Sequence, residues 1–237
     1  MTSYDDDFRL AAENLDLRRL LTEAGVTNAE HVVAQKLQQI MMEELHHRVK
    51  NILATVQAIT SQSLRSAENL DEGRTAIESR LQSLGRVHDL LLQKNWSKTK
   101  LEAILKVGIQ PYLTTSEPQI AMRSADIDVA PAAALPLAMV INELCTNAVK
   151  YGALSRSTGR VDLDATVTGA RDSFLLTWAE TGGPVVQKPS RRSFGSKLIE
   201  HAFVAQLQAK ADLSFDPGGV VYKLEVPLTA LNASISS

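Results

Sequence analysis

The chain has 237 residues, of which 44% are hydrophobic and 22% are charged, and its formal net charge at pH 7 is −2. This composition is typical of a globular protein and excludes a disordered chain, and the small net charge predicts no binding to nucleic acid. The single cysteine, Cys145, excludes an intramolecular disulfide and predicts a cytoplasmic location. The longest apolar run, residues 129–141, is too short to span a bilayer, so we expect no membrane segment.

Residues 1 to about 100 are predicted to be almost entirely helical, because they contain no proline and few glycines. From about residue 100 onward, glycines and prolines cluster and short β-branched runs appear, which places a boundary at 95–100. The sequence therefore predicts an α+β fold in four segments. These are a helical extension at 1–30, a helical hairpin at 31–98, an α/β sandwich at 99–230 and a tail at 231–237.

The helical half carries two apolar stripes with the heptad spacing of packed helices. The first consists of Met42, Leu45, Val49, Ile52, Val56 and Ile59, and the second of Ile77, Leu81, Leu84, His88 and Leu91. The polar residues 66–73 are expected to form the turn between the two helices. One hairpin leaves an apolar face uncovered, and a second copy of the chain, residues 1–40 or the second half of the same chain could cover it.

The second half predicts strands and helices whose order is typical of an α+β sandwich. The expected strands are 159–168, 173–180, 211–215 and 220–226, the last two joined by a tight turn at 216–219. The expected helices are 132–151 and 196–207. Strands paired as hairpins, with the helices on one face, would form the sandwich.

Four groups of polar residues could carry chemistry, and the first lies on the helix of the first stripe. His47 falls opposite Leu45 and Val49, on the face expected to meet solvent, and Asn51 follows one helical turn later. An exposed imidazole can act as a nucleophile, because nothing buries its ring nitrogen. The alternative is that this basic segment is only a solvated helix face.

The second group lies on the expected helix 132–151. Glu143, Asn147, Lys150 and Tyr151 recur at helical spacing and share one face. An amide oxygen such as that of Asn147 suits Mg²⁺, and the ammonium of Lys150 can meet phosphate oxygens. The alternative is an ordinary polar helix surface, although asparagine is a poor helix former and this segment contains two.

The third and fourth groups contain glycine. Glu180 ends a strand before Gly182 and Gly183, so its carboxylate can accept a hydrogen bond from an exocyclic amine while glycine lets a flat ring approach. Gly195 and Ser196 open an expected helix, whose free N–H groups favour a polyphosphate. An ordinary turn explains either motif separately. Taken with the second group, they can surround ATP and Mg²⁺.

Five segments, in this order along the chain, resemble the kinase core of bacterial two-component sensor histidine kinases. They are ELHHRVKNILATVQAI, RLQSLGRVHDLLLQKNW, NELCTNAVKYGALS, LTWAETGGPVV and FGSKLIE. The resemblance is to the HWE type and to its relative, the second histidine-kinase dimerisation family. Trp178 and Glu180 match the HWE type, whereas Asn142 stands where that type has a histidine. The resemblance implies a dimerisation and phosphotransfer hairpin followed by a GHKL-type ATP-binding domain.

The resemblance also implies a role for individual residues. His47 would be the phosphoacceptor, and Asn147 would hold Mg²⁺ with help from Glu143. The nucleotide site would be lined by Lys150, Tyr151, Glu180 (in place of an adenine-binding aspartate), Gly182, Gly183 and, after a short lid at 186–193, Gly195 and Ser196. We also hypothesise that Asn51 positions a water molecule for dephosphorylation.

The implied function is a sensor histidine kinase that phosphorylates its own His47 with Mg–ATP and passes the phosphoryl group to an aspartate of a response-regulator receiver domain. The implied partners are that receiver domain, a second copy of the chain in a homodimer, and a separate sensory protein, since no sensor domain is visible. Two alternatives are a histidine phosphotransferase whose second domain does not bind ATP, and a non-enzymatic coiled-coil adaptor. The presence of Asn147, Lys150, Glu180 and Gly182 argues against the first alternative, and the polar face of the expected helix 132–151 argues against the second.

Overall fold

The computed structural model describes residues 15–22, 28–113, 119–169, 172–186 and 209–232. The chain divides into two compact units, residues 1–57 and residues 58–237. Helix α2 (Asn28–Ser66) contributes to both units, whereas α3 (Leu70–Gln93) and the described strands belong to the second unit. The division into four segments made from the sequence stays a prediction.

The first three residues of the predicted α2 stripe are exposed, whereas Ile52 and Val56 are half-buried. Met42, Leu45 and Val49 expose 48%, 51% and 44% of their surface. Residues 15–22 are also helical. That another surface covers these side chains stays a prediction.

The turn between α2 and α3 is shorter than the predicted range 66–73. It spans residues 67–69, and α3 begins at Leu70. The Asn69 side chain accepts a hydrogen bond from the N–H of Glu72 at 2.9 Å, and the Glu72 carboxylate accepts one from the N–H of Glu68 at 2.9 Å. This reciprocal cap satisfies amides at the helix start, where acidic side chains also favour the positive end of the helix dipole. Asp71 and Glu72 of the predicted turn therefore belong to the helix.

The buried face of α3 includes Leu84 and Leu91 of the predicted stripe, but it is offset by one residue at two other positions. The side chains buried on this helix include Arg80, Leu84, Val87 and Leu91, whereas the predicted stripe residues Leu81 and His88 are only half-buried. The offset arises because α3 packs against α4 and α5 and sends Val87 and Leu91 into the main core of the second unit.

The second unit contains the α+β sandwich that the sequence predicts. Its five-stranded sheet has the order β2-β4-β5-β7-β6, with β2 parallel to β4 and the other neighbours antiparallel. The strands are β2 (Ile120–Ser124), β4 (Arg160–Thr168), β5 (Ser173–Thr181), β6 (Lys210–Asp216) and β7 (Gly219–Pro227), and a separate pair is formed by β1 (Thr99–Lys100) and β3 (Asp128–Val129). The four predicted strands are confirmed as β4 to β7, whereas β1, β2 and β3 were not predicted.

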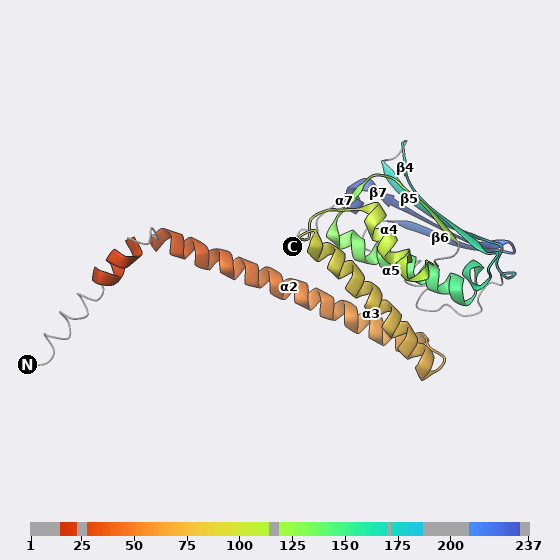
Figure 1. The fold of residues 1–237 in the computed structure, drawn as a ribbon, viewed down its shortest axis with the longest axis horizontal. Coiled ribbons are helices and arrows are strands. Elements are labelled where there is room, and N and C mark those ends of the chain that lie inside the picture. The colour runs from red at the N-terminus through yellow and green to blue at the C-terminus, as the bar shows by residue number, and fades with distance from the viewer. Residues whose placement is uncertain (1–14, 23–27, 114–118, 170–171, 187–208, 233–237) are drawn as a thin grey trace, which may run out of the picture. The chain divides into compact units, whose positions relative to one another are not determined.

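Helices α4 and α5 lie on one face of the five-stranded sheet (Figure 1). The helical segments that follow α3 are α4 (Leu101–Ile109), η1 (Gln110–Tyr112), α5 (Pro131–Lys150), η2 (Ala153–Ser155) and α7 (Leu228–Asn232). The expected helix 132–151 is confirmed as α5, and α4 is an addition to the prediction. The expected helix 196–207 lies outside the described residues.

Helix α5 and the inner face of the sheet form the main core. On β5 the fully buried Phe174, Leu176 and Trp178 alternate with half-buried neighbours, as the pleat requires. Trp178 pairs with Leu163 of β4 and with Tyr222 of β7. By length and composition α5 could cross a membrane, but 67% of its most apolar window is buried inside the protein, as in the core helix of a globular domain.

Candidate functional site

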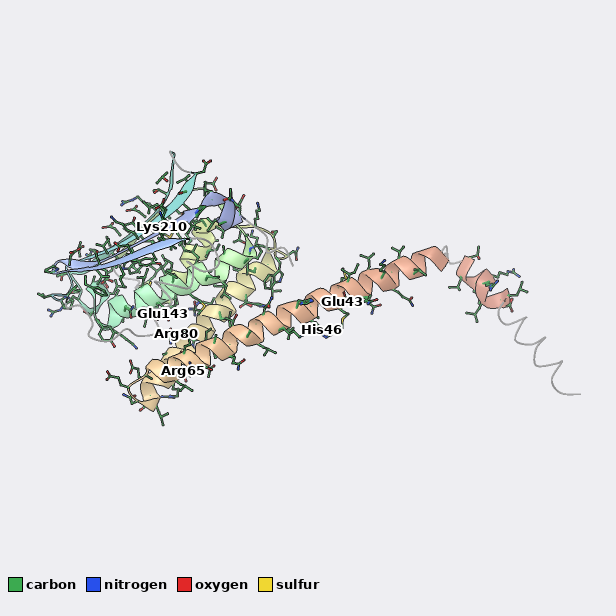
Figure 2. The ribbon with its side chains drawn as sticks, turned by 180° about the vertical axis from the view of Figure 1, so that it is seen from behind. Glu43, His46, Arg65, Arg80, Glu143 and Lys210 are labelled. Carbon is green, nitrogen blue, oxygen red and sulfur yellow. The ribbon has the colours of Figure 1, made fainter. Side chains whose placement is uncertain are left out.

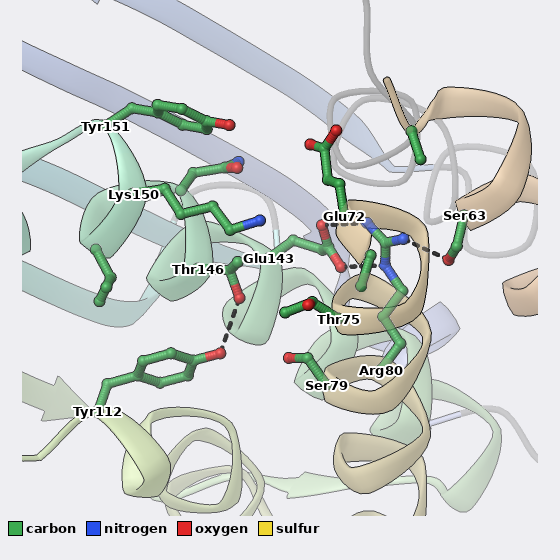
Figure 3. Close-up of a pocket in the computed structure, with 14 residues that line it drawn as sticks. Ser63, Glu72, Thr75, Ser79, Arg80, Tyr112, Glu143, Thr146, Lys150 and Tyr151 are labelled. Carbon is green, nitrogen blue, oxygen red and sulfur yellow. Dashed lines mark hydrogen bonds and ion pairs between the residues drawn. The ribbon is translucent and has the colours of Figure 1, made fainter. Parts of the chain in front are cut away.

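A cavity of about 250 Å³ lies in the second unit, between the C-terminal half of α5 and the hairpin (Figure 3). The hairpin lines it with small and charged side chains that include Ser63 at the end of α2 and Glu72, Thr75, Ser79 and Arg80 of α3. Side chains of α5 and η1 line the opposite side. Two separate parts of the sequence therefore bring polar and charged side chains to one cavity, next to apolar surface.

The four residues that the sequence groups on one helix face all line this cavity. Glu143, Asn147 and Lys150 follow one another along α5, and Tyr151 caps the helix by donating its N–H to the Asn147 carbonyl at 2.8 Å. Exposure increases along this series, from 4% for Glu143 to 69% for Tyr151. The helix thus presents a carboxylate, an amide, an ammonium group and an aromatic ring to one opening. Their roles toward a nucleotide stay predictions.

Arg80 of α3 forms a two-pronged ion pair with Glu143 of α5. Its Nε donates to Glu143 Oε1 at 2.6 Å, and its Nη2 donates to Oε2 at 2.9 Å. Its Nη1 donates to the Ser63 hydroxyl at 2.6 Å, as Figure 3 shows. A carboxylate predicted to work at the nucleotide site is therefore held by the hairpin.

A second polar cluster surrounds Asn142, beside the ion pair. The Tyr112 hydroxyl donates to the Asn142 side-chain oxygen at 3.1 Å and lies 2.8 Å from the Thr146 hydroxyl. The Asn142 amide also donates to the Ser79 hydroxyl of α3 at 3.5 Å. Burial raises the pKa of Tyr112, and its hydrogen bonds to Thr146 and Ser79 oppose that rise. The cluster joins α3, η1 and α5 next to the cavity.

Glu180 lies on the core face of β5 and does not line the cavity. Its Oε1 accepts a hydrogen bond from the Trp178 indole at 3.1 Å, and its Oε2 accepts one from the N–H of Ala153 at 2.7 Å. Residues two apart on a strand point to the same face, so the Trp178 indole lies beside the Glu180 carboxylate to which it donates. Burial raises the pKa of Glu180, and these two hydrogen bonds oppose the rise. The carboxylate fastens β5 to the segment after α5, and its predicted role toward adenine stays a prediction.

The glycine pair after β5 occupies space that no side chain could share. Gly182 has a φ of +70°, and a Cβ there would lie 2.7 Å from the Thr158 carbonyl oxygen. A Cβ on Gly183 would lie 2.8 Å from the Ala153 Cα. Tight turn packing therefore accounts for both glycines, and the approach of a flat ring stays a prediction. Gly195, Ser196 and most of the predicted lid lie outside the described residues.

His47 and Asn51 lie on α2 in the first unit. Both side chains are exposed, as the sequence predicts, and the neighbouring His46 is exposed as well (Figure 2). The Asn51 carbonyl accepts a hydrogen bond from the Thr55 hydroxyl at 2.9 Å, as part of the local helix. The residues that line the cavity all belong to the second unit. The roles predicted for His47 and Asn51 stay predictions.

Comparison with known proteins matches residues 44–126 to the model of the HWE histidine kinase family. A blue-light-activated histidine kinase of Brucella anthropi is 34% identical over 207 residues, which cover 86% of this chain and 42% of the relative. The chain belongs to the HWE histidine kinase family. The blue-light-activated histidine kinase of Brucella ovis is 32% identical in an alignment of 241 positions, which covers 95% of this chain and 49% of the relative. This HWE family member thus spans less than half the length of these curated relatives.

Solved structures share the fold of this HWE family member. The histidine kinase domain of the Erythrobacter litoralis EL346 blue-light activated histidine kinase has a TM-score of 0.56 and 16% identity, over 76% of this chain and 87% of that domain. A longer structure of the same protein also has a TM-score of 0.56, at 18% identity, over 86% of this chain and 61% of that one. At such low identity the likeness concerns the fold alone.

The sequence analysis of this HWE family member did not identify Arg80 as a site residue, although its position in the sequence indicates that it is buried. Arg80 stands four residues before Leu84, which belongs to the second apolar stripe, so it occupies a position on the buried side of the helix. A charged residue there requires a buried partner of opposite charge. The sequence offers many carboxylates, and only the fold identifies Glu143, which is 63 residues away, as the partner.

Proposed function

We propose that this chain is the kinase core of a sensor histidine kinase, which phosphorylates its own His47 with ATP. The phosphoryl group would then pass to an aspartate of a response-regulator receiver domain. The observation that carries the proposal is the cavity that Glu143, Asn147 and Lys150 of α5 line together. Membership of the HWE family supports this interpretation of the cavity.

The cavity suits the phosphate end of Mg–ATP. Lys150 would meet phosphate oxygens, and the amide oxygen of Asn147 would hold Mg²⁺, which prefers hard oxygen ligands and neutralises phosphate charge. At about 250 Å³ the cavity is smaller than the roughly 300–1,000 Å³ of typical ligand pockets, so the nucleotide would extend beyond it. Tyr151, which is 69% exposed, offers a ring at the opening.

His47 would act as the nucleophile. A neutral ring nitrogen attacks the γ-phosphorus, an N–P bond forms, and the bond to the bridging oxygen breaks so that ADP leaves with the electron pair. The proton on the other ring nitrogen is then lost to solvent. Such a transfer requires positioning and charge neutralisation more than covalent help from the protein, and the exposed side chain of His47 suits contact with both ATP and a receiver domain. Asn51, one turn further on, would position a water molecule for dephosphorylation, which releases inorganic phosphate.

The exposed stripe of α2 would bind a second copy of the chain. Met42, Leu45 and Val49 have the heptad spacing that a four-helix bundle uses, and each is at least 44% exposed in the single chain. We propose a homodimer through this surface and sensory input from a separate partner.

The proposal is tested by autophosphorylation with ATP labelled at the γ-phosphate, in the presence of Mg²⁺. We expect a label that is labile to acid and stable to base in the wild-type chain, and its loss in His47→Ala. His46→Ala is the matched control, because this neighbouring histidine is equally on the exposed surface, and it should keep the label.

Three results would contradict the proposal in different ways. A label retained in His47→Ala would show that another residue is the acceptor. Absence of both label and ATP binding in the wild type, with uptake of phosphoryl from a phosphorylated receiver domain, would show a phosphotransferase. Absence of all three activities would favour a non-enzymatic adaptor.

A further inference from the structure

We propose that Arg80 is a positioning residue for the phosphoryl transfer, because it orients the Glu143 carboxylate and ties it to both helices of the hairpin. The inference rests on the proposed function, and it assigns a part in that reaction to a hairpin residue that would act through α5. Arg80 and Glu143 lie next to one another in the second unit (Figure 2).

The geometry of the pair fixes the plane of the carboxylate. Two nitrogens of the Arg80 guanidinium reach the two oxygens of Glu143, at 2.6 Å and 2.9 Å. A planar fork of this kind holds a carboxylate against rotation, whereas a lysine ammonium would bind it as a point charge. The third nitrogen donates to Ser63 at 2.6 Å, so the end of α2 braces the guanidinium in turn.

Burial separates this ion pair from the others that the structure describes. The side chains of Arg80 and Glu143 are 9% and 5% exposed. By contrast, Arg74 is 69% exposed and pairs with Asp71 and Glu78 on its own helix. Water screens an exposed pair, while a buried pair keeps its strength and its geometry. Arg80 therefore restricts Glu143 far more than the surface pairs restrict their partners.

The position of Glu143 explains why its orientation matters. It lines the cavity one helical turn before Asn147, the proposed holder of Mg²⁺, and two turns before Lys150. The orientation of the Glu143 carboxylate would affect the rate of phosphoryl transfer, because small displacements of groups in an active site lower the rate. Nucleotide affinity, in contrast, would come from Asn147, Lys150 and Tyr151. Loss of the fork should thus reduce the rate of transfer and spare the affinity for ATP.

The experiment compares Arg80→Lys, Ser63→Ala and the control Arg74→Met in the full chain. Thermal unfolding first establishes that each variant folds, a fluorescent ATP analogue gives the dissociation constant, and labelled ATP at saturation gives the initial rate of autophosphorylation. We expect Arg80→Lys to lower the rate about tenfold or more, with an affinity within about threefold of wild type. Ser63→Ala should lower the rate less, because it leaves the fork in place. Arg74→Met should change neither quantity.

A second set of variants separates positioning from a structural role. If Arg80 acts through Glu143, then Arg80→Lys will not lower the rate further when Glu143→Gln is already present. Effects that multiply in the double variant, or an unchanged rate in a folded Arg80→Lys, would overturn the inference. If Arg80→Lys does not fold, the same comparison with Ser63→Ala decides the question. A wild-type chain that takes up no label refutes the proposed function and the inference together, whereas a labelled wild type with multiplying effects refutes the inference alone.

Discussion

Replacement of Gly152 by alanine should displace the Glu180 carboxylate. A Cβ at Gly152 would lie 2.0 Å from Glu180 Oε2, whereas ordinary contacts begin at 3.4 Å. The backbone of Ala148 closes the other side at 3.0 Å, so the methyl group has no free space to occupy. The carboxylate must therefore move by more than a hydrogen bond tolerates, and its 2.7 Å bond from the Ala153 N–H will break.

The expected loss of stability follows from two contributions. Overpacking a buried site destabilises a protein by about 1–3 kcal/mol. A lost hydrogen bond to a buried charged group adds about 1.5–3 kcal/mol. Because relaxation of the segment relieves part of both, we expect the free energy of unfolding to fall by about 2–4 kcal/mol. Urea unfolding followed by circular dichroism measures this change as a lower midpoint at an unchanged slope.

Gly85→Ala is the matched control for this substitution. Gly85 lies inside α3, and a Cβ there would meet no atom within 4 Å. Alanine is a better helix former than glycine, so this variant should gain about 0.5–1 kcal/mol. A Gly152→Ala variant within about 0.5 kcal/mol of wild type would refute the reasoning, because surface substitutions without structural effect lie in that range.

Three further predictions concern single groups. Cys145 is fully buried and its thiol pKa is raised by that burial, so iodoacetamide should modify it in urea but not in the native chain, as mass spectrometry would show. Asn69→Ala removes the cap of α3 and should lower the free energy of unfolding by about 1 kcal/mol, and an unchanged urea midpoint would contradict this. Burial raises the pKa of Glu180 above its ordinary value of 4.5, so between these two values the folded chain holds a proton that the unfolded chain has lost. Stability should therefore fall as pH rises through this window, and Glu180→Gln should remove this component of the urea midpoint's pH dependence.

The parts of the fold that the sequence predicts well are those with a local pattern. Strands β4 to β7 show alternation or apolar runs with turn residues between them, and α5 has a long apolar pattern. Strand β2 escaped prediction because it has five residues and pairs with β4, about forty residues further along the chain. Helix α4 escaped because nine residues ending near Pro111 give little periodic signal.

The candidate site shows the same division between local and distant information. Helical spacing alone groups Glu143, Asn147 and Lys150, and the structure finds them around one cavity. The hydrogen bond between Trp178 and Glu180 could also have been predicted from the sequence, because alternation along β5 places both side chains on its apolar face. The partner of Arg80 could not be predicted from the sequence, because only the packing of α3 on α5 brings Glu143, 63 residues away, next to it.

Helix α3 is attached to the rest of the second unit in different ways along its length. Near its C-terminal end, Val87 and Leu91 are buried in the main core, whereas further toward its start Ser79 and Arg80 meet α5 through hydrogen bonds. Separation at the polar end returns both charges of the ion pair to water, while separation at the other end exposes apolar surface. The free energy of local opening is therefore lower at the Arg80 end. We therefore expect α3 to separate from α5 first near Arg80, while the part around Leu91 stays packed in the core.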